Sequence, residues 1–352
     1  MTAILSSVSL FMCLSVFITL VKNDYWIFKI LEYPRLQKLF LIAVMLIIWA
    51  FYFPLEDSFP KISFGFLCLA GVYVAYKVLP YTVLTRREMK KVTTSEEANE
   101  LSIYAANVFQ DNTEYHRVLE QIKQEDPDIV FLLETNKAWE NGLAQLDNDY
   151  PYSLRMPLEN TYGLLFFSRL KMENGEVKFL VKNDIPSIEV DIILRNGTKV
   201  KVWGLHPEPP VPGESLYATA KDKELMKVAL KARECDCPCI VFGDLNDVAW
   251  SHTTELFRKT SRLLDPRRGR GFYATFSAHS RFLRFPLDYI FASPDFGLIS
   301  MKRMPKNGSD HFATSTRLAY IPSLEKVQEA PSADAEELQE AKEKSTTQVN
   351  ED

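Results

Sequence analysis

Residues 239–246 read Cys-Ile-Val-Phe-Gly-Asp-Leu-Asn, an apolar run that leads directly into two polar side chains, Asp244 and Asn246. A short, nearly continuous apolar run bounded by turn residues is typical of a strand buried on both faces. Six more runs of this kind lie between residues 101 and 293, and residues 114–125 and 222–233 have helical spacing. Strands alternating with helices predict one α/β domain over residues 101–321.

Polar residues concentrate where these predicted strands begin or end. The set is Asn107, Glu134, His206, Asp244, Asn246, Asp288 and the pair Asp310–His311. Each of them alone is most simply explained as a loop carboxylate or a turn residue. As a set they predict a functional site, because open α/β sheets bind their ligands at strand ends.

The acidic members of this set suit a divalent cation. Mg²⁺ binds through oxygen ligands and is commonly held by one or two carboxylates together with water and substrate phosphate, and Mn²⁺ is an alternative. Glu134, with Asn107 and Asp310 nearby, is the predicted metal site.

The remaining members suit hydrolysis of a phosphate ester. Asp244, with the amide of Asn246 two residues away, predicts a base that deprotonates or orients water. Asp288 and His311 predict a carboxylate–imidazole pair that donates to phosphoryl oxygens.

The sequence resembles the endonuclease/exonuclease/phosphatase superfamily, with the deoxyribonuclease-I-like fold, and more narrowly a membrane-anchored, bacterial-type member. The matching segments, in the family's order, are AANVF, DPDIVFLLETN, YGLLFFSR, WGLHPEPP, VFGDLND, PLDYIFAS and GSDHFATS. The resemblance implies a four-layer α/β sandwich and magnesium-dependent cleavage of phosphoesters.

The resemblance also implies roles for the matching residues. Glu134 matches the metal-binding Glu, Asn107 the first-motif Asn, Asp244 and Asn246 the base and its positioning amide, Asp288 and His311 the Asp–His couple, Asp310 the acidic residue before that His, and His206 the histidine of the deoxyribonuclease and sphingomyelinase branches. Apurinic-site endonucleases carry a further Asp shortly after the first-motif Asn, where this chain has Val108-Phe109-Gln110. That departure argues against the repair branch.

Three stretches nearly free of charge precede this domain and predict membrane spans near residues 3–21, 39–55 and 62–84. About 20 apolar residues cross a bilayer core of about 30 Å, so residues 1–86 are expected to form a membrane anchor. Lysine and arginine are frequent between the first two spans and after the third, but only Lys61 lies between the second and third. This bias predicts a multi-pass protein of the cell membrane with the catalytic domain in the cytoplasm.

Two polar segments flank the predicted domain. Residues 87–100 lack apolar periodicity and are expected to be a linker. Residues 322–352 carry three basic and nine acidic residues with few large apolar side chains, which predicts a disordered acidic tail. The chain's net charge of −5 excludes a protein that holds nucleic acid by overall positive charge.

Residues 258–284 form a basic segment with eight Lys or Arg against one acidic residue. A solvated basic face is the simpler explanation, but the position before Asp288 favours capture of an anionic substrate by Arg267, Arg268 and Arg270. Aromatic residues within it would stack on bases or insert among lipid tails. Nucleic acid, nucleotide and phospholipid head group all remain possible substrates, presented beside a lipid bilayer.

Three function classes follow from these observations. The first is a membrane-anchored, metal-dependent phosphodiesterase or nuclease. The second is a phospholipid or inositol-phosphate phosphatase, or a sphingomyelinase-like enzyme, of the same fold. The third is a non-catalytic membrane adaptor, against which the full set of acidic and histidine residues argues.

Overall fold

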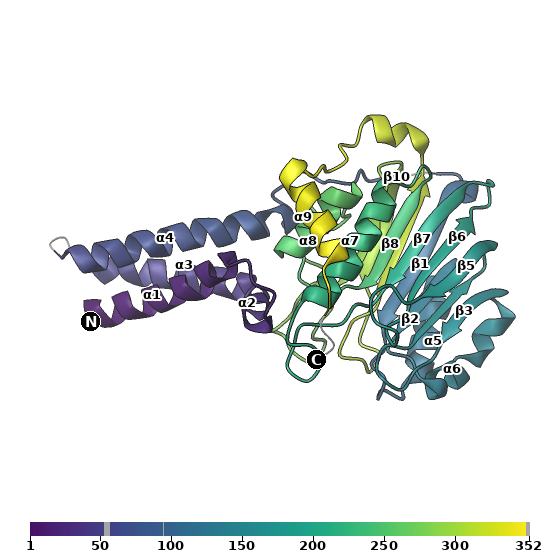
Figure 1. The fold of residues 1–352 in the computed structure, drawn as a ribbon, viewed down its shortest axis with the longest axis horizontal. Helices are drawn as coiled ribbons and strands as arrows, with labels where there is room; N and C mark the ends of the chain where they lie inside the picture. The colour runs from purple at the N-terminus through teal and green to yellow at the C-terminus, as the bar shows by residue number, and fades with distance from the viewer. Residues whose placement is uncertain (53–56, 94, 350–352) are drawn as a thin grey trace.

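The structure is a computed structural model that describes residues 1–52, 57–93 and 95–349. Three long helices project from an α/β domain, and the chain's later segments all belong to that domain (Figure 1). The N-terminal part comprises α1 (Thr2–Phe17), the 3-10 turn η1 (Ile18–Leu20), α2 (Trp26–Ile30), α3 (Arg35–Tyr52), α4 (Ser58–Val78) and η2 (Leu79–Tyr81).

The α/β domain contains two mixed β-sheets. The first has the strand order β10 (Phe296–Arg303), β11 (Thr314–Tyr320), β1 (Glu100–Asn107), β2 (Ile129–Leu133), β4 (Leu164–Ser168), β3 (Tyr152–Met156). The second has the order β5 (Met172–Lys178), β6 (Ser187–Ile193), β7 (Lys199–Leu205), β8 (Cys239–Asp244), β9 (Asp288–Ala292). In each sheet one central pair is parallel, β1 with β2 and β7 with β8.

Helices cover the outer faces of both sheets, which gives the expected four-layer sandwich. The first sheet is covered by α5 (Tyr115–Glu125) and α6 (Lys137–Gly142), and the second by α7 (Thr219–Arg233) and α8 (His252–Ser261). Helix α9 (Ala335–Thr346) packs against α7. The domain also contains the short 3-10 turns η3 (Glu97–Asn99), η4 (Ala144–Asn148) and η5 (Pro322–Lys326). Strand β2 is buried on both faces by this arrangement. Phe131 packs between the two sheets, whereas its neighbours Val130 and Leu132 pack against the helical layer. Strands buried on both faces therefore have continuous apolar sequences.

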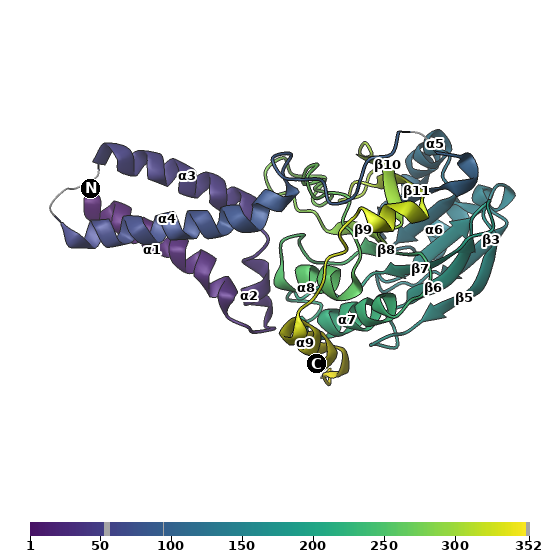
Figure 2. The same ribbon diagram turned by 90° about the horizontal axis from the view of Figure 1, so that it is seen from above.

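Helices α1, α3 and α4 are long and apolar enough to cross a bilayer. The apolar segments span Thr2–Leu20, Arg35–Tyr52 and Ser58–Tyr81, with mean hydropathy of 2.2, 1.7 and 1.8. These bounds agree with the predicted spans to within a few residues, although positions 53–55 of the second prediction lie outside the described residues. Helix α4 packs against both α1 and α3, whereas α1 and α3 contact each other less extensively (Figure 2).

The segment expected to be a linker is instead fastened to the domain. Met89 is fully buried, and the main chain of Val92 donates to Leu298 at 2.9 Å. Glu88 forms ion pairs with Arg258 at 2.5 Å and with Arg268 at 2.8 Å. Opposite charges and one apolar side chain thus fix a stretch whose polar composition predicts flexibility; Thr94 within it lies outside the described residues.

The segment expected to be a disordered tail contains helix α9. Its N-terminus has a capping box between Asp334 and Glu337. The helix docks through charge: Lys344 lies 2.8 Å from the buried carboxylate of Asp222, and Lys259 lies 2.5 Å from Glu337. The prediction of disorder is therefore wrong for Ala335–Thr346, because ion pairs replace the large apolar side chains that the tail lacks; residues 350–352 lie outside the described chain.

Candidate active site

Strand pairing brings the predicted residues to one edge of both sheets. Asn107 ends β1 and Glu134 directly follows β2, and these two strands are parallel. Asp244 ends β8, and Asp288, which begins the antiparallel strand β9, is its direct partner in the ladder. The two sheets meet here, since the Asn107 side chain donates to Asp244 across them at 3.2 Å.

Glycine at position 243 allows the backbone of β8 to approach β7. Gly243 has φ of +136°, and a Cβ atom there would lie 2.0 Å from the carbonyl oxygen of Leu205. The next residue, Asp244, is then presented at the strand tip, where the main-chain amide of Asn246 donates to its Oδ1 at 2.9 Å. The Gly-Asp-Leu-Asn sequence therefore fixes the orientation of this carboxylate.

His311 lies between two carboxylates. Its Nδ1 is 2.9 Å from Oδ2 of Asp288, and its Nε2 is 3.5 Å from Oδ2 of Asp244. Burial lowers the pKa of His311, but the charges of Asp288 and Asp244 outweigh it and raise the pKa to about 10. The ring is thus an imidazolium at neutral pH, with its orientation set by Asp288.

Burial also affects the carboxylate that faces this imidazolium. It raises the pKa of Asp244 well above the usual range of an aspartic acid, while the charge of His311 opposes the rise. A carboxyl group with a raised pKa is a stronger base once it is ionised. The Asp288–His311–Asp244 arrangement therefore offers an acidic and a basic group side by side.

Asn107 and Glu134 form the adjoining part of the site. The Asn107 side-chain amide donates to Oε1 of Glu134 at 2.6 Å, and Asn107 Oδ1 accepts from the amide of Phe109 at 3.1 Å. Glu134 is half-buried and has φ of +57°, a left-handed conformation that turns the chain sharply after β2. Burial raises the pKa of Glu134, and the nearby charge of Asp310 raises it further.

The oxygen atoms around Glu134 are suitable ligands for a divalent cation. Carboxylate and amide oxygens are available from Glu134, Asn107 and the half-buried Asp310. The ligand atoms of Asp244, Asp288 and His311 also lie within 4.8 Å of one another. In that second group, however, the imidazolium itself supplies positive charge between the carboxylates.

Two other predicted residues flank this centre. The Asn246 side chain donates to the carbonyl of Pro207 at 3.0 Å, so it holds the loop after β7 as well as positioning Asp244. His206 is buried, its Nδ1 has no hydrogen-bond partner among the described residues, and its ring lies 5.4 Å from that of Tyr162. Burial, with the charge of His311, lowers the pKa of His206 to about 3, so this ring is neutral.

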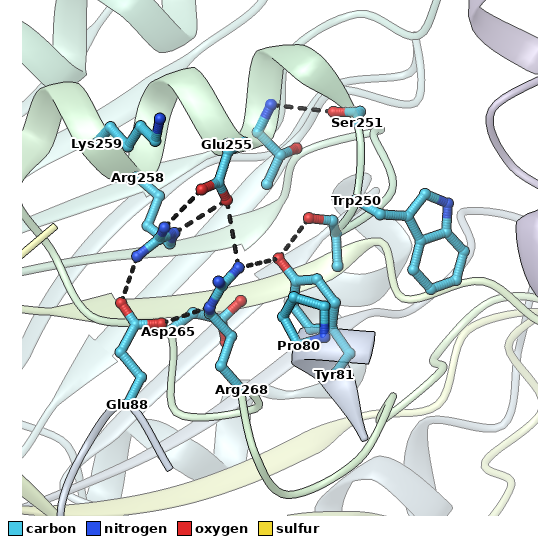
Figure 3. A network of polar contacts seen from close by, with 12 residues as sticks. Pro80, Tyr81, Glu88, Trp250, Ser251, Glu255, Arg258, Lys259, Asp265 and Arg268 are labelled. Carbon is cyan, nitrogen blue, oxygen red and sulfur yellow. Dashed lines mark hydrogen bonds and ion pairs between the residues drawn. The ribbon is translucent and has the colours of Figure 1, made fainter. Parts of the chain in front are cut away.

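The three arginines predicted to capture substrate have structural partners instead. Arg267 is fully buried, and its guanidinium bonds Asp265 at 2.7 Å and the carbonyl of Asp288 at 3.2 Å. Arg268 joins Glu88, Glu255 and the hydroxyl of Tyr81 in the network of Figure 3. Arg270 donates to the carbonyls of Pro266 and Met89. These side chains fasten the basic segment to the anchor and the core, which corrects the predicted role.

A different pair of arginines lies beside the site. The guanidinium carbons of Arg284 and Arg303 lie 5.1 and 4.3 Å from the ring centre of Phe312, the residue after His311. Neither guanidinium has a carboxylate partner within the part of the chain that the structure describes. Arg284 belongs to the basic segment, but its pairing with Arg303 is a tertiary contact that no local pattern indicates.

The comparison with known families rests on the region that contains this site. The sequence model described as "Endonuclease/Exonuclease/phosphatase family" matches residues 105–311, more than half of the chain. The chain belongs to the endonuclease/exonuclease/phosphatase family. Members of this family are phosphoric ester hydrolases, and the matched region runs from the end of β1 to His311. No curated protein matches the chain in sequence.

Solved structures of the family share the fold. The endonuclease/exonuclease/phosphatase from Beutenbergia cavernae is 18% identical over 63% of this chain and 72% of that chain, with a TM-score of 0.50. TDP2 from D. rerio, solved with single strand DNA product, is 18% identical over 62% and 98%, with a TM-score of 0.52. The human nocturnin catalytic domain, with bound sulfate anion, is 17% identical over 66% and 97%, with a TM-score of 0.52. At these identities the likeness shows the fold alone.

Proposed function

We propose that this chain is a membrane-anchored phosphoester hydrolase that depends on a divalent cation, with Mg²⁺ as the expected ion. The observation that carries the proposal is the line of Asp288, His311 and Asp244, with contacts of 2.9 and 3.5 Å, beside the Asn107–Glu134 pair. Family membership supports the reaction class, and the three apolar helices support the anchor.

In the proposed reaction, the ionised carboxylate of Asp244 accepts a proton from a water molecule. The water oxygen forms a bond to phosphorus, and the ester P–O bond to the leaving group breaks. The imidazolium of His311, oriented by Asp288, donates a hydrogen bond to a phosphoryl oxygen as negative charge develops there. Asn246 keeps Asp244 in position through its main-chain amide.

The cation would be held by Glu134 with Asn107 and Asp310. The residues fit it, because Glu134 is a half-buried carboxylate that accepts from the Asn107 amide, and Asp310 lies near enough for its charge to act on Glu134. When bound, such an ion neutralises charge on the phosphoryl group and orients it. Burial raises the pKa of Glu134, so a cation that favours the ionised form should bind more weakly as the pH falls.

The test uses the full chain purified in detergent. Hydrolysis of bis-p-nitrophenyl phosphate and p-nitrophenyl phosphate is measured with Mg²⁺, with Mn²⁺ and with EDTA. We expect activity that EDTA abolishes and added Mg²⁺ restores. Glu134→Gln should require more Mg²⁺ for half-maximal activity, whereas the matched surface change Glu120→Gln on α5 should not. Activity that survives chelation would refute the metal, and no activity on any phosphoester would favour a non-catalytic adaptor.

The bias of lysine and arginine supports a second proposal, that the catalytic domain faces the cytoplasm. Lys22 and Lys29 lie between the first two spans, and Arg35 and Lys38 lie in the first turn of the second. These residues and the cluster that begins at Arg86 lie on the same side as the domain. Protease added to sealed inside-out vesicles should digest the domain, while intact cells should protect it. The opposite pattern would reverse the orientation.

A further inference from the structure

The connection between the first two candidate spans lies against the loops of the active site. Residues 21–34 leave η1 and enter α3. Within them the carbonyl of Asp24 accepts from the amide of Ala218, and the amide of Trp26 donates to the carbonyl of Leu216, both at 2.8 Å. This interspan segment thereby packs on the loop that carries His206 at its start.

The same interspan segment contacts a catalytic loop directly. The hydroxyl of Tyr33 donates to the carbonyl of Asn246 at 2.8 Å, and the indole of Trp250 donates to the carbonyl of Glu32 at 2.8 Å. The apolar helix α3 begins at Arg35, two residues after Tyr33. Asn246 and the adjoining base Asp244 therefore lie at the depth of the lipid head groups if α3 crosses the bilayer.

The loop of residues 276–285, which precedes Asp288 in the chain, also reaches the start of α3. The first residue of this loop lies at the active site, since the ring of Phe276 is 4.9 Å from that of His311. Its tip is held at the first turn of α3, where the side chain of Gln37 donates to the carbonyl of Phe282 at 2.6 Å. Phe282 and Leu283 at this tip are 84% and 56% exposed. Exposed apolar side chains at the start of a membrane span favour insertion among lipids.

The last residue of the loop, Phe285, connects it to the interspan segment. The ring of Phe285 packs against that of Tyr33 at 5.5 Å, so aromatic side chains connect the interspan segment to the loop. Arg284 and Arg303 both lie over the ring of Phe312, the residue after His311. Exposed apolar groups thus lie at the loop tip, and two cationic groups lie over the residue that follows His311, which fits the apolar and anionic parts of a phospholipid.

We propose that the substrate is a phosphoester carried by a membrane lipid, taken directly from the bilayer surface on which the domain sits. This rests on the proposed hydrolase function. The lipid's phosphate binds beside His311, and Phe282 and Leu283 hold the loop in the head-group region. Water supplies the oxygen that bonds to phosphorus and gives its proton to Asp244, the ester P–O bond breaks, and the released alkoxide takes a proton from solvent water.

The experiment compares one double variant with a matched control in the full chain. Phe282→Ser/Leu283→Ser removes the exposed tip, and Phe179→Ser/Val327→Ser removes two apolar side chains of 44% and 49% exposure elsewhere. Each protein is reconstituted in vesicles of phosphatidylcholine that contain phosphatidylglycerol, phosphatidic acid or phosphatidylinositol 4-phosphate. Release of phosphate or head group is measured alongside hydrolysis of soluble bis-p-nitrophenyl phosphate and single-stranded DNA.

We expect turnover of a vesicle phospholipid by the parent and the control. The tip variant should have a KM for that lipid about tenfold higher or more, with hydrolysis of bis-p-nitrophenyl phosphate unchanged. A separate Phe282→Trp variant should show more fluorescence quenching by brominated lipids than the parent, whose five tryptophans set the baseline, and this difference tests insertion without activity.

Three results would overturn this proposal. They are hydrolysis of single-stranded DNA but of none of the three lipids, equal lipid KM values in the tip variant and the parent, and quenching of the Phe282→Trp variant no greater than that of the parent. In the first of these the hydrolase function stands and only the substrate class fails. Absence of hydrolysis on every substrate, bis-p-nitrophenyl phosphate included, would instead refute the underlying function and this proposal with it.

Discussion

Replacing Arg267 by glutamine should destabilise the catalytic domain and leave substrate binding unaffected. The guanidinium donates to Asp265 from Nε at 3.0 Å and from Nη2 at 2.7 Å, and it lies 3.9 Å over the ring of Tyr289. Asp265 is itself fully buried. Glutamine supplies neither the charge nor the two-pronged contact, so it leaves a buried carboxylate unpaired, which costs about 3–5 kcal/mol. For a domain of this size that corresponds to a fall in Tm of about 6–20 °C.

Thermal unfolding of the full chain in detergent, followed by tryptophan fluorescence, measures this effect. Arg281→Gln is the matched control, because Arg281 lies in the same basic segment but is exposed, and its change should stay within about 0.5 kcal/mol. Arg267→Lys should fall between the two, since it keeps the charge without the fork. An unchanged Tm for Arg267→Gln, together with a raised KM, would refute the structural role and restore the predicted contact with substrate.

Three more predictions concern the site and the C-terminal helix. Asp244→Asn removes the proposed base and should lower kcat about 10²-fold or more with little change in the Mg²⁺ requirement, and parental activity would exclude that role. The value of kcat/KM should fall at low pH as Asp244 becomes protonated, at a pH above the usual pKa range of an aspartic acid. It should also fall at high pH as His311 loses its proton near pH 10. A value of kcat/KM that stays constant at high pH would contradict the imidazolium. Lys344→Met removes the ion-pair partner that lies 2.8 Å from buried Asp222, and it should lower the free energy of unfolding by about 1–3 kcal/mol. The control Lys342→Met, on the exposed side of α9, should leave it unchanged. Equal Tm values for the two variants would show that α9 does not dock as described.

The strand-end residues were predictable because their positions follow from local patterns. An apolar run shows where each strand ends, and parallel pairing of β1 with β2 and of β7 with β8 then brings Asn107, Glu134 and Asp244 to one edge. Asp288 joins them through antiparallel pairing, which the chain order of a known family also implies. No distance between the sheets was needed for that prediction.

The partners of Arg267 and of helix α9 were not predictable in the same way. A net charge summed over residues 258–284 treats every cation as solvated, although Asp265 neutralises Arg267 inside the core. The capping box at Asp334 is visible in the sequence, but docking of α9 depends on Asp222, which lies 122 positions before Lys344. The hydrogen bond of Tyr33 to Asn246 spans 213 positions and belongs to the tertiary structure alone.

The docking of α9 has a consequence for biosynthesis. Besides α7, the helix contacts the start of the interspan segment, where Lys22 lies 3.3 Å from Glu340 and Asp24 lies 3.6 Å from Lys344. Lys22 and Glu340 are 318 positions apart in the chain. At about 5–20 residues per second, a ribosome needs about 16–64 s to make the chain between them. The anchor therefore enters the membrane well before α9 exists, and during this interval Lys22 and Asp24 lack the ion pairs that Glu340 and Lys344 of α9 later provide.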